Sequence, residues 1–540
     1  MKKRNTFRGL LMAGVVLLAV LFSSCAKTAY KKAIPADAPV VVELDVKNVG
    51  LKSNFLSHKE EIADLVLSID PEDEMLAKVA KALRNSEEFG LDFMSPMYIF
   101  SDAEFDNGYF LASVKSKDEV VKKVSSFTDE IEIKESGDVS WIKVEGEYVG
   151  VLTANSLLLG SSNDKSDYSA FLDQSGKDCF INTDAGKYMS KHTGDITAMF
   201  NAEAIPSRMK REIRHSVERE IDRDFREIFN DELWDKFFEM QVVLNMKFTS
   251  GDVSLNLFTT MENENKDVAK KISKDALKQV PSKNLVGLLA LGIDGEEFYK
   301  ALDEQLEKLD YNSTEASVVL GMASEYLKAM NGTMVAALSG KNWSKDPEFL
   351  GIIPLSYDKV KPFLRLMDVD DLPYGISLDG DKQSTSITNI RNYSHGDVSA
   401  PFELASHASS CYLYGYVNAE PLVELANEEL RDNDSDKAKL NRSIRNALDL
   451  LNYAELKIEK LDAASLAVVL TDDSKNSLEL LLEHGLKIAN AAFEYEQSRR
   501  ERYNSYSNYY DSYDWDDEAV DSLEEIDWDA LMEEVASEWD

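Results

Sequence analysis

The sequence predicts an α+β fold built from two homologous halves, each with antiparallel strands or hairpins and amphipathic helices. Three observations lead to this prediction. Short strand-like segments are joined by tight turns, strand and helix periodicities alternate along the chain, and one series of segments recurs in the same order. Adjacent strands joined by short turns must run antiparallel, which excludes a doubly wound parallel sheet.

The first residues of the chain are typical of a secreted bacterial lipoprotein. A basic start is followed by the apolar run Leu10–Phe22, and these 13 residues are too few to span a bilayer as a helix. The segment Leu21–Cys25 resembles a lipobox, which implies cleavage before Cys25 and attachment of acyl chains, palmitate among them, to that residue. We therefore expect a signal peptide at 1–24 and an anchor linker at 25–32. Ordinary secretion without lipid is the alternative.

The residues after Cys25 predict where the anchored protein resides. Ala26 and Lys27 follow the cysteine, and the first acidic residue is Asp37. By resemblance to lipoprotein sorting rules, this pattern implies the outer membrane, and the missing acidic run favours the periplasmic face over the cell surface. Cys179 and Cys411 remain after lipidation. We expect buried free thiols there rather than a disulfide.

The internal similarity consists of four pairs of segments in the same order. The pairs are Ile34–Leu44 with Val280–Leu291, Tyr109–Val120 with Leu350–Val360, Ala198–Glu203 with Gly415–Glu420, and Gln241–Thr260 with Ala454–Thr471. A helix is expected after the last pair, starting at Lys266 in one half and at Ser477 in the other. We infer two homologous halves, 33–275 and 276–497.

Turn signals predict individual hairpins inside each half. Gly146-Glu147 separates two strand-like segments, and Asp379-Gly380-Asp381 separates another two. Apolar residues at helical spacing predict helices at Lys117–Phe127 and Ser477–Glu496.

Residues 498–540 are expected to form a disordered, Tyr-rich and acidic tail. Asp511–Asp540 holds 14 acidic residues and no Lys or Arg, so a helix there would have no i,i+4 ion pairs to stabilise it. Asp521-Ser522-Leu523 resembles an O-glycosylation acceptor of envelope proteins, which makes Ser522 a candidate glycosylation site.

The composition excludes a nucleic-acid partner. The 540 residues include 98 acidic and 60 basic side chains, giving a net charge of −38. Such a chain lacks the cations that replace phosphate counterions, and a bare anionic lipid surface would repel it.

The search for catalytic and metal-binding motifs yields no candidate residue. No two of the six histidines lie within four positions of each other, and there is no G-x-S-x-G motif. We therefore assign no catalytic, cofactor or metal residue, and no cofactor. Two Asn-Ala-Glu segments, at Asn201/Glu203 and Asn418/Glu420, could form a duplicated ligand site. Asn between a strand and a helix is also an ordinary N-cap, and we favour the cap.

One stretch carries a family resemblance. Ile34-Pro35-Ala36-Asp37-Ala38-Pro39-Val40-Val41-Val42, then Asp45-Val46 and Leu51-Lys52-Ser53, resembles a family of Bacteroidetes lipoproteins of unknown function, the domain-of-unknown-function 4836 family. The resemblance implies an envelope location and no established activity, so it assigns no catalytic residues.

Two functional hypotheses follow. The first is a non-enzymatic lipoprotein, held at the outer membrane by its lipid, that binds a protein or an envelope polymer. The alternative is an envelope hydrolase that acts on glycan or peptidoglycan through dispersed carboxylates. Two carboxyl groups converging in one deep cleft would favour the hydrolase.

Overall fold

The computed structural model describes residues 29–511 except 70, 72, 86–88, 127–129, 173–178, 221–230, 262–266, 309–313, 367–374, 397, 399 and 431–436. The expected signal peptide, Cys25 and Ser522 lie outside the described residues. The end of the expected linker does not: η1 (Ala29–Ala33) is a short 3-10 helix whose Tyr30 is buried in a hydrophobic core. The folded body therefore begins earlier than the sequence suggested, because the Tyr30 ring has a place among apolar side chains.

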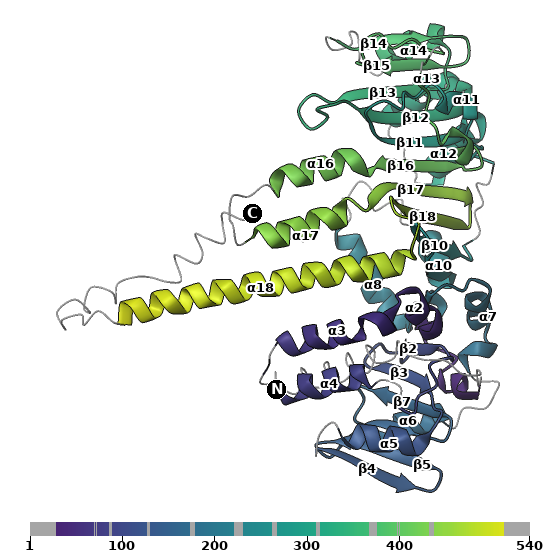
Figure 1. Ribbon diagram of the computed structural model, residues 1–540. Helices are drawn as coiled ribbons and strands as arrows, with labels where there is room; N and C mark the ends of the chain where they lie inside the picture. The colour runs from purple at the N-terminus through teal and green to yellow at the C-terminus, as the bar shows by residue number, and fades with distance from the viewer. Residues whose placement is uncertain are drawn as a thin grey trace, which may run out of the picture.

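The fold is organised around one 18-stranded sheet (Figure 1). All of its strand pairings are antiparallel, as the sequence predicted. From one edge to the other the strands are β4 (Ile131–Ser136), β5 (Val139–Val144), β6 (Glu147–Leu152), β7 (Ser156–Gly160), β3 (Gly108–Ser113), β2 (Met97–Ser101), β1 (Val40–Leu44), β8 (Ile196–Asn201), β9 (Gln241–Phe248), β10 (Asp252–Thr259), β18 (Ala463–Leu470), β17 (Leu451–Lys460), β16 (Leu413–Asn418), β11 (Leu285–Asp294), β12 (Asn331–Ser339), β13 (Glu348–Ile353), β15 (Thr385–Thr388) and β14 (Ser377–Gly380).

The two sides of the sheet have the same order of strands when each is followed outward from the central pair, β10 and β18. From β10 the neighbours are β9, β8, β1, β2, β3, β7 and β6. From β18 they are β17, β16, β11, β12, β13, β15 and β14. β10 and β18 pair with each other, and Leu255 lies opposite Leu466 at the centre of that ladder. β4 and β5 extend one end without a counterpart.

Helices cover both faces of the sheet in the part nearest the β4 edge. Alternate strand residues belong to different cores because successive side chains point to opposite faces. Phe110 packs in a core with α2 (Val46–Lys52), α3 (Phe55–Ile69), α4 (Glu74–Arg84), α5 (Lys117–Ser125) and α18 (Ser477–Asp511). We name this side the α3 face. Tyr109 and Leu111 pack in a core with η1, α6 (Lys165–Leu172), η3 (Phe180–Asn182) and α7 (Asp184–Lys191) on the other side, the α7 face.

A third core lies on the α7 face of the second half. Leu288, Ala290 and Tyr414 point into it, together with residues of α11 (Lys274–Leu277) and α15 (Ala405–Ala408). The remaining helices connect strand ends. They are η4 (Ala202–Ala204), α8 (Ser207–Glu220), α10 (Asp231–Glu239), α12 (Gly295–Lys308), α13 (Thr314–Ala329), α14 (Tyr357–Leu366), α16 (Ala419–Glu429) and α17 (Ala438–Leu448). In Figure 1, α3, α4, α16, α17 and α18 project to one side of the stacked strands.

Both predicted hairpins are present. Glu145 and Gly146 join β5 to β6 with positive φ angles of 54° and 86°, the conformation of a tight hairpin turn. β14 and β15 pair as expected from Asp379-Gly380-Asp381. The helix expected from Lys266 is wrong, because Ala269 forms a strand-like bridge with Ile293 and the next helix begins at Lys274.

α18 is longer than the sequence predicted. It runs from Ser477 through Asp511, about 52 Å at 1.5 Å per residue, so the tail expected to be disordered from residue 498 begins inside a helix. Extending an existing helix needs no new nucleus, and the ion pair between Glu496 and Arg499 (3.3 Å) supports it at the predicted boundary. The tail from 512 to 540 lies outside the described residues.

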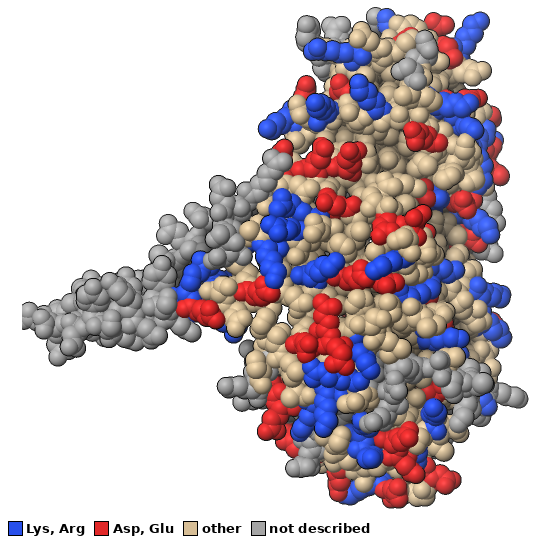
Figure 2. Space-filling view, in the orientation of Figure 1, with Lys and Arg blue, Asp and Glu red and all other residues tan. Residues whose placement is uncertain are grey.

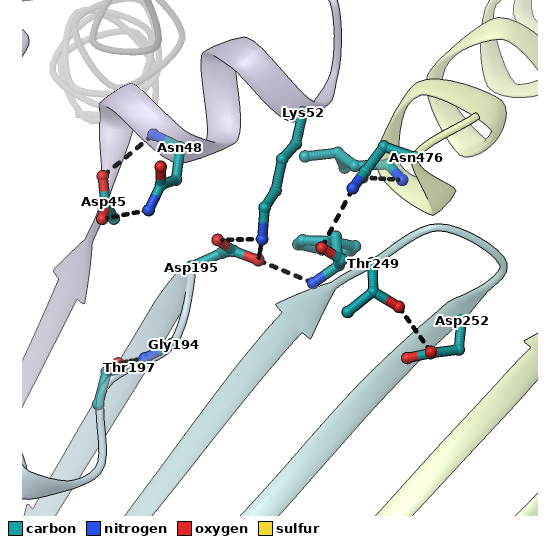
Figure 3. A network of polar contacts seen from close by, with 11 residues as sticks. Asp45, Asn48, Lys52, Gly194, Asp195, Thr197, Thr249, Asp252 and Asn476 are labelled. Carbon is teal, nitrogen blue, oxygen red and sulfur yellow. Dashed lines mark hydrogen bonds and ion pairs between the residues drawn. The ribbon is translucent and has the colours of Figure 1, made fainter. Parts of the chain in front are cut away.

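A buried carboxylate joins four elements where α18 begins (Figure 3). Asp195, just before β8, is ion-paired with Lys52 at the end of α2, with the Lys52 Nζ 2.8 Å and 2.7 Å from the two carboxylate oxygens. The backbone N–H of Phe248 also donates to this carboxylate, at 2.7 Å. On the same turn, Asn476 donates to the Phe248 carbonyl oxygen, and the Ser477 N–H donates to Thr249. The joint thus ties α2, β8 and β9 to the first turn of α18.

Replacing Lys52 by Met should destabilise the fold by about 3 kcal/mol, because it leaves a buried carboxylate without its cation. The side chain of Asp195 is 4% exposed and that of Lys52 is 30% exposed. Urea unfolding followed by circular dichroism measures the change. Lys187→Met, which breaks the exposed pair with Asp184, is the control and should change stability by less than about 1 kcal/mol. Equal effects of the two substitutions would contradict the role given to Asp195.

Candidate functional site

A serine, a histidine and an aspartate converge on the hairpin of β14 and β15. His395 Nδ1 lies 2.7 Å from Ser386 Oγ, and His395 Nε2 lies 3.3 Å from Ser384 Oγ and 4.0 Å from Asp381 Oδ2. Backbone N–H groups of Gln383 and Ser384 donate to Asp381 and lower its pKa. Ser386 is fully buried, so its hydroxyl cannot reach a substrate carbonyl. This group therefore stabilises the hairpin.

A second polar cluster lies between α3 and α18. His58, Glu479 and Glu483 each offer a ligand atom, and these atoms lie within 4.8 Å of one another. Lys475 forms an ion pair with Glu483 and lies 3.7 Å from Glu479. The hydrogen bond from Lys475 holds the pKa of Glu483 below its ordinary value. Lys475 already supplies the positive charge that a bound cation would bring, so the cluster is an ion-paired contact between two helices.

A cleft of about 420 Å³ lies between α8 and α10. Its lining mixes acidic, basic and aromatic side chains: Glu203, Asp235, Glu239, Lys210, Arg211, Arg214, Trp234 and Phe238, with Ser207 beside them. Two of the three cations make several hydrogen bonds, and Arg211 donates to the carbonyl oxygen of Ser207 at 3.4 Å. Arg214 hydrogen-bonds Glu218 and Asp231, which raises its pKa, and Lys210 donates to the carbonyl oxygens of Glu203 and Phe238. The carboxylates of Glu203, Asp235 and Glu239 and the guanidinium of Arg211 have no ion-pair partner among the described residues and could contact a ligand.

The centre of the α3 face holds half of the 16 large hydrophobic residues that are exposed among the described residues. Eight aliphatic side chains on it are between 36% and 51% exposed: Leu244, Leu255, Leu257, Leu289, Leu291, Val417, Leu456 and Leu466. They come from six adjacent strands, β9, β10, β18, β17, β16 and β11. We name these eight residues the central apolar face.

No charged residue interrupts the central apolar face. On the six strands, the side chains that point to this face include less exposed residues as well as the eight named above. They are Val242, Leu244, Met246, Phe248, Val253, Leu255, Leu257, Thr259, Ala464, Leu466, Val468, Leu470, Ala454, Leu456, Ile458, Leu413, Gly415, Val417, Gly287, Leu289 and Leu291. The charged residues of these strands, such as Lys247, Glu455 and Lys457, alternate with them and point to the α7 face. A contiguous apolar surface of this kind marks an interaction site.

The two Asn-Ala-Glu segments behave differently. Asn418 caps α16, its side-chain oxygen accepting from the Glu420 N–H at 3.2 Å. Asn201 makes no such bond at η4, and its buried Oδ1 has no hydrogen-bond partner. The cap prediction is confirmed at Asn418 and wrong at Asn201, because only Asn418 leads directly into an α-helix. Glu203 lines the α8–α10 cleft, whereas Glu420 does not. Cys179 and Cys411 are buried and are not joined in a disulfide, as expected.

Sequence reasoning missed the central apolar face and the cluster around His58. The paired segments Gln241–Thr260 and Ala454–Thr471 supply strands of this face, but the exposure of their side chains depends on what covers the assembled sheet. The histidine and the two glutamates are more than 400 positions apart in the chain, so no local spacing connects them.

Comparison with known proteins gives a family without an activity. The family model described as "Domain of unknown function (DUF4836)" matches residues 30–354. No curated protein matches the chain.

Two solved structures, crystal forms IV and I of TP0453, overlap with parts of the chain. They share 12% and 8% identity, cover 43% and 44% of this chain and 83% and 81% of their own, and give a TM-score of 0.23 each. So low a score carries no argument about fold or function. The family match extends over more than half of the sequence, and the chain belongs to the DUF4836 family of unknown function.

Proposed function

We propose that this protein is a lipid-anchored envelope protein that acts by binding through its central apolar face. The exposure of that face is the observation that carries the proposal. Folding buries apolar surface wherever it can, so eight half-exposed aliphatic residues on a rigid sheet are costly to keep open. Covering each one would contribute on the order of 1 kcal/mol, since part of each side chain is already buried.

The polar clusters support binding over catalysis. The hydroxyl of Ser386 is closed off from solvent, and the carboxylates near His58 are paired with Lys475. The central apolar face offers shape and apolar area, which serve recognition, and carries no group that transfers protons or attacks a substrate.

The lipid on Cys25 and the periplasmic face of the outer membrane belong to the same proposal. They rest on the lipobox-like segment and on the residues that follow it. Among the described residues, no helix is both long and apolar enough to cross a bilayer. Acyl chains on Cys25 would supply the attachment, since two or more chains hold a protein stably where one does not.

Replacing Cys25 by Ala should abolish incorporation of labelled palmitate and release the protein into the soluble periplasmic fraction. The measurement is metabolic labelling followed by fractionation of the envelope. Cys179→Ala, which removes a buried thiol, is the control and should leave labelling unchanged. Palmitate labelling that persists without Cys25 would contradict the anchor.

We also propose that the two halves descend from one duplicated unit. The common strand order and the central pairing of Leu255 with Leu466 support this. A further likeness is that Pro35 and Pro281, which precede the first strand of each half, both make an isolated antiparallel bridge.

The binding role can be tested in the native envelope by photo-crosslinking. A benzoylphenylalanine at Leu255 or Leu466 should yield defined crosslinked products, because both side chains lie on the central apolar face. The control position is Leu51 on α2, which is 70% exposed and is not one of the eight residues of that face. Crosslinks from Leu51 equal to those from Leu255 would contradict a dedicated surface.

The alternative, an envelope hydrolase, has one observation in its favour. The α8–α10 cleft is lined by the carboxylates of Glu203, Asp235 and Glu239, and paired carboxylates are the catalytic groups of most glycoside hydrolases. If this cleft is catalytic, purified protein should release soluble fragments from peptidoglycan, and a Glu203→Gln, Asp235→Asn, Glu239→Gln variant should not. Glu212→Gln, on the exposed side of α8, is the matched control. Mass spectrometry of the released fragments decides the question, and the absence of release by the unmodified protein removes this alternative.

A further inference from the structure

One uninterrupted row of opposed residues crosses the sheet on the α3 face. Each residue lies directly across from the next on the neighbouring strand. The row is Met97, Leu44, Ile196, Met246, Leu255, Leu466, Leu456, Gly415, Leu289 and Ala336. Every member is uncharged, and the row passes from one half to the other at Leu255 and Leu466.

The first end of this row is covered and the remainder is open. Met97 is buried beneath α3, α4 and α18, with Leu44 packed against the same core. From Met246 to Leu289 the row crosses five strand spacings, about 24 Å at roughly 4.8 Å each. Four of its side chains there belong to the central apolar face: Leu255, Leu466, Leu456 and Leu289.

The open part of the row is long enough to accommodate an acyl chain. The hydrocarbon core of a bilayer is about 30 Å thick, so the chains of one leaflet extend about 15 Å. Such a chain fits within the open segment with room to spare. Leu257 and Leu244 on one side, and Val417 on the other, widen the surface beyond a single row. Gly415 has no side chain, so the row has a shallow depression there, bordered by the side chains of Leu456 and Leu289.

The chemistry of the surface favours a lipid over a protein. Binding hot spots between proteins are enriched in Trp, Tyr and Arg, and Leu and Val are under-represented there. All eight residues of the central apolar face are Leu or Val, without an aromatic ring or a charge. A flexible hydrocarbon chain needs apolar area and no hydrogen-bond partner. Leu and Val side chains offer apolar area and carry no hydrogen-bonding group.

A basic helix that leads into one strand of this face supplies a partner for phosphate. α17 leads directly into β17, the strand that carries Leu456, and packs along α18. It contains Lys439, Arg442 and Arg445 and no acidic residue. Lys439 is ion-paired with Glu494, whereas Arg442 and Arg445 have no carboxylate partner among the described residues. Arg445 Nε donates to the carbonyl oxygen of Asn441 in the same helix, at 3.4 Å. Blue side chains gather in Figure 2 where Figure 1 places α17. A guanidinium is well suited to phosphate, which it binds through two parallel hydrogen bonds.

We propose that the central apolar face binds the acyl chains of a glycerophospholipid, with the lipid phosphate at Arg442 and Arg445. The overall negative charge disfavours a whole anionic membrane surface, but it leaves this locally basic helix free to hold one headgroup. The inference rests on the proposed binding function and names the chemistry of what is bound.

The test uses the full chain with Cys25→Ala, so that its own lipid does not interfere, and pyrene-labelled phosphatidylethanolamine as the probe. Binding should be saturable. Leu255→Asn with Leu466→Asn should weaken it at least tenfold, while Leu51→Asn with Ile69→Asn, at positions 70% and 66% exposed, should leave it unchanged. Arg442→Glu with Arg445→Glu should weaken phosphatidylethanolamine binding but not binding of pyrene-labelled diacylglycerol, which has no phosphate.

A second measurement does not depend on variants that must fold. Phosphatidylethanolamine with a diazirine in its acyl chain should label peptides from 241–259 and 451–470 in the Cys25→Ala chain. Labelling confined to other segments, or unchanged binding by a folded Leu255→Asn, Leu466→Asn variant, would overturn the lipid inference. If photo-crosslinking from Leu255 captures a protein while no phospholipid binds, the lipid inference fails and the proposed binding function stands.

Discussion

The pairing of β10 with β18 is the contact on which the rest of this molecule depends. Seven residue pairs, from Asp252 with Val469 to Phe258 with Ala463, join what would otherwise be two sheets with open edges. An unpaired central edge would present free N–H and C=O groups to any other chain. α18 strengthens the same junction, because it leaves the end of the second half and packs Leu486 into the core of the first. The ion pair between Lys52 and Asp195 then fixes the strands against which the base of α18 lies.

This junction also creates the surface to which we assign function. Neither half alone carries the whole open row from Met246 to Leu289. Met246 and Leu255 belong to one half, and Leu466, Leu456 and Leu289 belong to the other. Joining the halves in register places these residues in line. The exposed surface is therefore a property of the assembled sheet, while the polar clusters around His395 and His58 serve local packing.

Much of the fold could be predicted from local patterns. The tight turn predicted at Gly146-Glu147 requires antiparallel strands. The paired segments Ala198–Glu203 and Gly415–Glu420 contribute β8 and β16, which occupy matching places in the strand order. The continuity of the sheet could not be predicted, because nothing in the sequence of β10 says that β18, some two hundred residues later, is its partner. The helix through Asp511 was missed for a related reason: its Tyr- and Arg-rich end has no aliphatic periodicity, and it is helical because it continues a helix anchored at Ser477. The candidate site was missed because alternation reveals which strand residues share a face, but not whether another layer covers that face.

The opposition of Leu255 and Leu466 has a consequence for how such a molecule could arise. If the two halves descend from one duplicated unit, as we propose, the seven opposed positions of β10 and β18 are related by a local twofold axis perpendicular to the sheet. A shorter chain containing one half would carry the same edge strand, and two copies of it could join through the same seven positions without any new contact. Such a pair would be a symmetric homodimer with a self-complementary interface. Fusing its two chains into one would keep the continuous sheet while allowing the two sides to diverge, so that one gained β4 and β5 and the other gained α18.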